Sequence, residues 1–171
     1  MSMYQRIIVP VDLNSNPLSQ IGLRTAIALA QDQNATLKII TVVDEAIMGL
    51  SGEFGWTDPA TFDALMRDEA QKQLDHSIRS INDSTVKTET EVIEAPDGHV
   101  ARHIEAAALA WQADLIVIGT QGHHGLARWL SGLAGSTSVN LLHMTRLPLL
   151  VVPNVVPDPL HGAQEKAPAH D

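Results

Sequence analysis

The chain has 171 residues, no cysteine, and a formal net charge of −9 from 11 basic and 20 acidic side chains. One domain is expected at this length, and a hydrophobic share of 44% is enough to build a core. The charge argues against non-specific binding to nucleic acid or to an anionic membrane, and the lack of cysteine excludes disulfides, cysteine nucleophiles and thiolate metal sites.

Five short apolar runs predict strands, and all but one read as nearly continuous hydrophobic stretches. Such runs are typical of strands that are buried on both faces of a parallel sheet. The third run alternates Thr and Glu, so it is expected to be an outer strand. In chain order, the predicted strands cover residues 6–11, 37–43, 86–93, 115–118 and 149–152.

Four segments with helical spacing of apolar residues lie between the strands. They cover residues 18–33, 59–81, 97–111 and 136–143, and Asp97 is expected to cap the third helix. Strict alternation of strand and helix predicts an α/β fold, a doubly wound five-stranded parallel sheet with right-handed crossovers.

Two segments do not fit the alternation. Residues 46–58 are interpreted as a loop with apolar contacts, whose glycines and Trp56 make a lid conceivable. Residues 154–171 have no periodicity and are expected to be a flexible C-terminal tail, which leaves 1–153 as the single domain. The N-terminal apolar run is too short for a signal peptide, and no stretch approaches the roughly 18 apolar residues of a membrane span. A cytoplasmic protein is therefore expected.

The carboxyl ends of the strands are the expected place for a ligand, because open α/β sheets bind there, where the strand order reverses. Asp12 follows the first strand, Val42 lies near the end of the second, and a glycine-rich stretch over 119–138 follows the fourth. Within that stretch, Gly135 and the hydroxyl residues 136–138 lie at the start of a predicted helix, and free N–H groups at a helix start bind phosphate well. The alternative interpretation is an ordinary glycine-containing loop with a serine cap. The stretch has no Gly-Lys-Ser/Thr, so it is not a P-loop.

The sequence resembles the universal stress protein family (UspA-like). The matching pieces are Arg6-Ile-Ile-Val-Pro-Val-Asp12, Asp114-Leu-Ile-Val-Ile-Gly-Thr-Gln-Gly122, Gly135-Ser136 and Pro148-Leu-Leu-Val-Val-Pro153, in this order. Together they cover residues 3–153. The resemblance implies the fold derived above, of the Rossmann-like type, and a role in stress response.

Some members of that family bind ATP through the motif Gly-x2-Gly-x9-Gly-Ser/Thr. Gly122, Gly125 and Gly135-Ser136 satisfy this spacing, although the glycine that ends the fourth strand is Gly119. Counted from Gly119, the motif would reach Gly132, which Leu133 follows, so the loop is expected to be about three residues longer than usual.

The resemblance therefore implies an ATP, ADP or AMP site, with magnesium as a possible companion. The residues carried over, or placed beside the phosphates, are Pro10, Val11, Asp12, Val42, Gly119, Gly122, His123, Gly125, Gly135, Ser136, Thr137 and Ser138. Asp12 has an alternative interpretation as a turn cap, and Val42 as plain core. No catalytic residue and no protein-held metal site are predicted.

The fifth strand, Leu147 to Val152, is short, apolar and flanked by prolines, and an apolar edge strand invites pairing with another chain. In related family members this strand pairs with its own copy, so the resemblance implies a homodimer with Val151 and Val152 near the two-fold axis.

The histidines allow more than one interpretation. His99 and His103 lie four residues apart on a predicted helix and form a conceivable metal pair, but no third ligand is apparent and solvated surface histidines are the simpler reading. His123, His124 and Arg128 lie in the glycine-rich loop, where they could contact phosphate or simply face solvent.

Three functions remain in competition. The first is a nucleotide-binding regulatory protein of the stress-response type, with slow ATP hydrolysis at most. The second is a dimeric adaptor or chaperone-like protein that binds no nucleotide, because the longer loop would have disrupted the phosphate site. The third, an enzyme of the wider superfamily, is disfavoured by the absence of Cys and of a Lys between Gly119 and Gly135.

Overall fold

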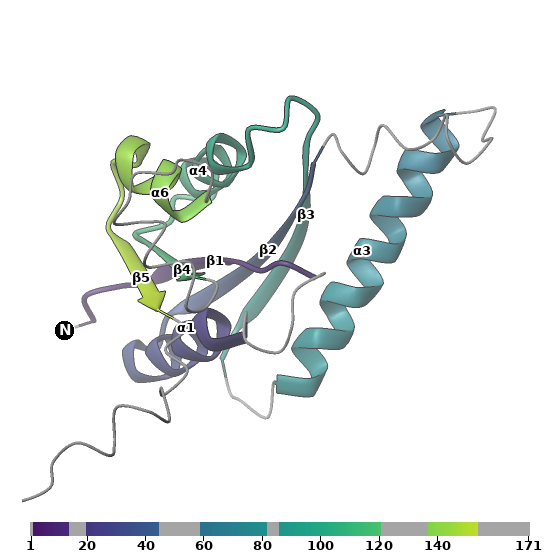
Figure 1. The fold of residues 1–171 in the computed structure, drawn as a ribbon. Coiled ribbons are helices and arrows are strands. Elements are labelled where there is room, and N and C mark those ends of the chain that lie inside the picture. Colours follow the sequence, from purple (N-terminus) through teal and green to yellow (C-terminus); the bar gives the residue numbers. More distant parts are fainter. Residues whose placement is uncertain (1, 14–19, 45–58, 82–85, 121–136, 154–171) are drawn as a thin grey trace, which may run out of the picture.

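The computed structural model describes residues 2–13, 20–44, 59–81, 86–120 and 137–153. Strands and helices alternate along the chain (Figure 1). The strands are β1 (Arg6–Pro10), β2 (Thr36–Asp44), β3 (Thr88–Ala95), β4 (Leu115–Thr120) and β5 (Leu149–Pro153). The helices are α1 (Gln20–Gln33), α3 (Pro59–Ile81), α4 (Val100–Ala110) and α6 (Thr137–Met144). None of the described helices is long and apolar enough to cross a membrane.

The five strands form one parallel sheet in the order β3-β2-β1-β4-β5. The first three strands therefore extend the sheet in one direction, and the chain then returns past β1 to build β4 and β5 on its other side. This is the doubly wound topology that the sequence predicts. β3 and β5 are the two edge strands, which confirms the outer position expected for the polar third run.

Alternation along the central strands divides the core into two layers. On β1, Ile7 and Val9 are fully buried against one face, while Ile8 is fully buried against the other. The first face is covered by α1 and α3, through residues such as Leu23 and Leu74. The second face is covered by α4 and α6, and this arrangement is visible in Figure 1. Burial on both faces explains why these strands read as continuous apolar runs.

Most element boundaries differ from the sequence prediction by one or two residues, and three differences bear on the site or on the edges of the sheet. The third strand runs from Thr88 to Ala95, two residues later than expected. The first ends at Pro10, although the N–H of Val11 still donates to the carbonyl of Ile40 at 2.8 Å. The prediction that Asp97 caps α4 is wrong, because the helix starts at Val100 and His99 occupies the N-cap position without a side-chain capping bond. Gly98 has φ of +67° and turns the chain before the helix can begin.

Candidate functional site

The site predicted from the sequence lies at the carboxyl edge of the sheet, around the ends of β1 and β4. These two strands are neighbours in the sheet. After β1 the chain builds β2 and β3 on one side, and it then builds β4 and β5 on the other side, so the strand order reverses between β1 and β4. Their paired register covers Ile7 with Leu115 and Ile8 with Ile116, and both strands continue beyond it. In open α/β sheets, this is where connections diverge and leave a crevice for a ligand.

A close backbone approach fixes one side of this edge. A Cβ placed on Gly22 in the first part of α1 would lie 2.7 Å from the backbone nitrogen of Gly119 and 3.0 Å from its Cα. Only glycine at position 22 lets α1 lie this close to the end of β4. The sequence prediction named Gly119 but missed Gly22. The signal in the sequence is a glycine inside a helical pattern. Glycine there destabilises a helix by about 1 kcal/mol relative to alanine, so its presence indicates that close packing requires it.

The end of β1 supplies three of the predicted residues. Pro10 pairs with Ile40 of β2 and is half-buried. Val11 packs against the α1/α3 face of the core, and Asp12, the next residue, is exposed. Val42 lies near the carboxyl end of β2 and packs against the α4/α6 face. The structure therefore brings all four residues to the same edge of the sheet.

The start of α6 supplies two hydroxyl residues. Thr137 is the first residue of the helix and is half-buried, and Ser138 is buried, with 8% of its surface exposed. Leu141, one turn later, is fully buried in the same core layer as Ile116 and Ile118 of β4, which anchors the helix against the sheet. The N–H groups of a first helical turn have no partner within the helix and favour an anion.

The remaining predicted site residues lie outside the described part of the chain. They are Gly122, His123, Gly125, Gly135 and Ser136. The same is true of His124 and Arg128, of the possible lid at 46–58, and of the tail at 154–171.

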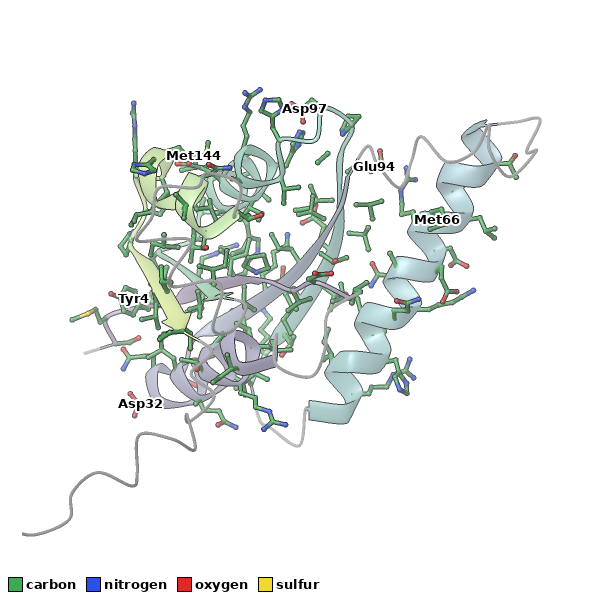
Figure 2. All side chains as sticks on the ribbon, in the orientation of Figure 1. Tyr4, Asp32, Met66, Glu94, Asp97 and Met144 are labelled. Atoms are coloured by element: carbon green, nitrogen blue, oxygen red, sulfur yellow. The ribbon has the colours of Figure 1, made fainter. Side chains whose placement is uncertain are left out.

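A second polar cluster lies at the same edge, in the turn between β3 and α4, where Figure 2 labels Asp97. Its carboxylate accepts the backbone N–H of His99 at 3.0 Å and contacts Nε2 of His103 at 2.8 Å, with a guanidinium nitrogen of Arg102 at 3.5 Å. The N–H of His99, and then the side chain of His103, lower the pKa of Asp97 below its ordinary value. His99 is the N-cap residue of α4, so the two histidines of the conceivable metal pair do not both lie on the helix. Among the described residues, no group of three His, Asp or Glu could hold a metal.

Comparison of the chain with known proteins shows which family it belongs to. A model of the universal stress protein family matches residues 3–153. The chain belongs to this family. The universal stress protein A homolog 1 of Coxiella burnetii is 31% identical over 149 residues, which cover 87% of this chain and 96% of the relative.

Two solved structures of universal stress proteins share the fold of this family member. The protein from Archaeoglobus fulgidus in complex with dAMP has 20% identity and a TM-score of 0.58, and the match covers 88% of this chain and 98% of that one. A universal stress protein in complex with cAMP has 21% identity and a TM-score of 0.56, with 89% and 98% covered. The doubly wound fold predicted from the sequence is thus confirmed.

Proposed function

We propose that this universal stress protein is a dimeric regulatory protein of the cytoplasm that binds an adenine nucleotide, ATP or its products ADP and AMP, and changes its partner contacts with nucleotide state. The observation that carries the proposal is the meeting of three elements at one edge: the end of β1, the end of β4, and the start of α6 with its hydroxyl residues. The dAMP and cAMP complexes of two proteins with this fold support an adenine nucleotide as the ligand class.

Each described residue has a role that its position supports. In this proposal the backbone of Val42 contacts the base, and the hydroxyls and N–H groups of Thr137 and Ser138 contact the phosphates. Close packing of Gly22 on Gly119 holds the end of β4 beside α1 and keeps the edge free of side chains there. Gly122, Gly125, Gly135 and Ser136 complete the phosphate loop in this proposal, with His123 beside it.

Magnesium fits only as a companion of the phosphates. Asp12 offers one exposed carboxylate at the end of β1, and no group of three His, Asp or Glu among the described residues could hold a metal alone. Magnesium commonly binds one or two carboxylates together with phosphate oxygens and water. We assign no general base, so the proposal includes slow hydrolysis at most.

The dimer is proposed through the segment Leu147 to Val152. β5 is an edge strand, with Leu150 37% exposed and Val151 and Val152 half-buried. Pairing with the same strand of a second copy would cover these apolar side chains and satisfy the free edge of the sheet.

The test begins with the purified protein, which is denatured so that any released small molecule can be identified by mass spectrometry. Calorimetry then measures the binding of ATP, ADP and AMP with and without magnesium, while sedimentation measures the size of the assembly. We expect adenine nucleotide to bind and Ser138→Ala to weaken it about tenfold, because one phosphate contact is lost. Asp12→Asn should reduce the effect of magnesium only, and Asp32→Asn, an exposed acid on α1, is the matched control.

A protein that contains no nucleotide and binds none when supplied would overturn the proposal. A stable dimer with that result would favour the second candidate, an adaptor that binds no nucleotide. The sequence feature that favours this alternative is the spacing of the glycine-rich loop, which is expected to be about three residues longer than usual when it is counted from Gly119.

A further inference from the structure

A groove separates α3 from β3, away from the candidate nucleotide site at the carboxyl ends of β1 and β4. It has a volume of about 420 Å³ and is lined by Ala64, Arg67, Asp68 and Gln71 of α3 and by Thr90, Glu91 and Val92 of β3. Figure 2 shows Glu94, near the end of β3, on the side that faces α3. The nucleotide proposal makes no use of this groove.

One wall of the groove is the outer edge of the sheet. β3 pairs with β2 on one side, and no described strand pairs with its other side. The carbonyl of Lys87 accepts the N–H of Leu37, so the backbone N–H and C=O groups of the odd-numbered residues of β3 face β2. Because these groups alternate along a strand, the N–H and C=O groups of Thr90 and Val92 point outward. A row of such groups is a template on which another strand can pair.

The other wall is one face of a long helix. Ala64, Arg67, Asp68 and Gln71 follow the spacing of a single helical face. Arg67 forms an ion pair with Glu94, and the amide of Gln71 donates to Thr90 Oγ1 at 3.1 Å. These contacts hold α3 beside β3 without closing the groove. An edge strand facing a helix is the arrangement in which protein domains bind an extended peptide as an added strand.

The negative charge of β3 indicates what kind of peptide segment the groove would bind. Its sequence, TETEVIEA, contains three glutamates and no basic residue. Glu91 and Glu94 are paired with Lys38 and Arg67, yet their side chains remain 46% and 36% exposed. Glu89 is exposed and accepts the neutral indole N–H of Trp111. A second copy of β3 would bring three more glutamates to the same edge, and like charges on paired strands repel.

We infer that the groove between α3 and β3 is a docking site for an extended, basic segment of a partner protein, which adds to the outer edge of β3 as a sixth strand. Backbone hydrogen bonds to Thr90 and Val92 supply the pairing. The glutamates reject another copy of this strand and attract lysine and arginine.

The test uses a fluorescein-labelled ten-residue peptide in which Lys alternates with Val and Thr. Fluorescence anisotropy measures its binding to the full chain without added nucleotide, so the result is independent of the nucleotide site. We expect saturable binding, with shifts of the Thr90 and Val92 amides in NMR spectra. Thr90→Pro removes an outward N–H and should weaken binding about tenfold, whereas Thr90→Ala keeps the N–H and should not. Proline is tolerated where the N–H of an edge strand faces solvent, and circular dichroism checks that the variant is folded.

Two control peptides separate strand addition from simple charge attraction. The same peptide N-methylated at alternate residues keeps its charge but loses backbone donors, and it should bind at least tenfold more weakly. The peptide with Glu in place of Lys should not bind. Equal binding of the methylated peptide, amide shifts located elsewhere, or no binding of the basic peptide would each overturn the inference. If Thr90→Pro does not fold, the methylated peptide and the NMR shifts still decide.

Discussion

Replacing Gly22 with alanine sets two physical effects against each other. In an exposed helix interior, alanine is more favourable than glycine by about 1 kcal/mol. At position 22, however, the new Cβ would lie 2.7 Å from the nitrogen of Gly119 and 3.0 Å from its Cα. Both atoms belong to the backbone of another glycine, so no flexible side chain can move aside. Overpacking of this kind costs typically about 1–3 kcal/mol.

The expected result is therefore a net loss of stability of about 1 kcal/mol, the middle of the packing cost less the gain in helix propensity. Urea unfolding followed by circular dichroism measures it. Ala28→Gly, at an exposed position of α1, calibrates the propensity part and should cost about 1 kcal/mol. If Gly22→Ala proved more stable than the wild type, helix propensity alone would account for it, and the close approach of α1 to β4 would be refuted. Nucleotide affinity measured in parallel should fall, because the end of β4 must shift.

Two further predictions concern polar clusters away from the carboxyl ends of β1 and β4. Trp111 is 9% exposed, donates its indole N–H to Glu89, and has its ring centre 4.4 Å from the guanidinium carbon of Arg6. Trp111→Phe removes the hydrogen bond and weakens the cation–π contact, so it should lower the free energy of unfolding by about 1–2 kcal/mol. An unchanged urea midpoint would contradict this. The pKa of Asp97 is lowered in the folded protein, chiefly by the His99 N–H, so its carboxylate stabilises the fold at pH values above its ordinary pKa of 3.8 and loses this effect as pH falls through the lowered value. The stability difference between wild type and Asp97→Asn should therefore shrink as the pH falls from about 5 to below 4, and a difference that grows over this range would show that the sign is wrong.

The sequence predicts the order of elements well because burial on both faces leaves a continuous apolar mark on β1, β2 and β4. It predicts boundaries less well where that mark is absent. The Thr/Glu pattern of β3 is not a continuous apolar run, and the prediction places this strand two residues early. In the sequence, Asp97 looks like a helix cap. In the structure, Gly98 turns the chain after it, so the carboxylate accepts the N–H of His99 within that turn.

At the candidate site, the residues at strand ends are predictable from the sequence, since position along a strand decides which edge of the sheet they reach. Asp12, Val42 and Gly119 are of this kind, and their role in binding stays a prediction. Gly22 was missed because its reason lies in a neighbour 97 positions away in the sequence, on another element. A pattern read along one helix carries no information about such a backbone approach.

The strand order has a consequence for assembly. If two copies join through β5, the ten strands form a single sheet whose outermost strands are both β3. Nine spacings of about 4.8 Å then place these acidic edges roughly 43 Å apart. A partner with two basic segments separated by a linker of that reach would bind the second segment at a high effective concentration. Breaking the dimer would remove this bivalent advantage without altering either groove.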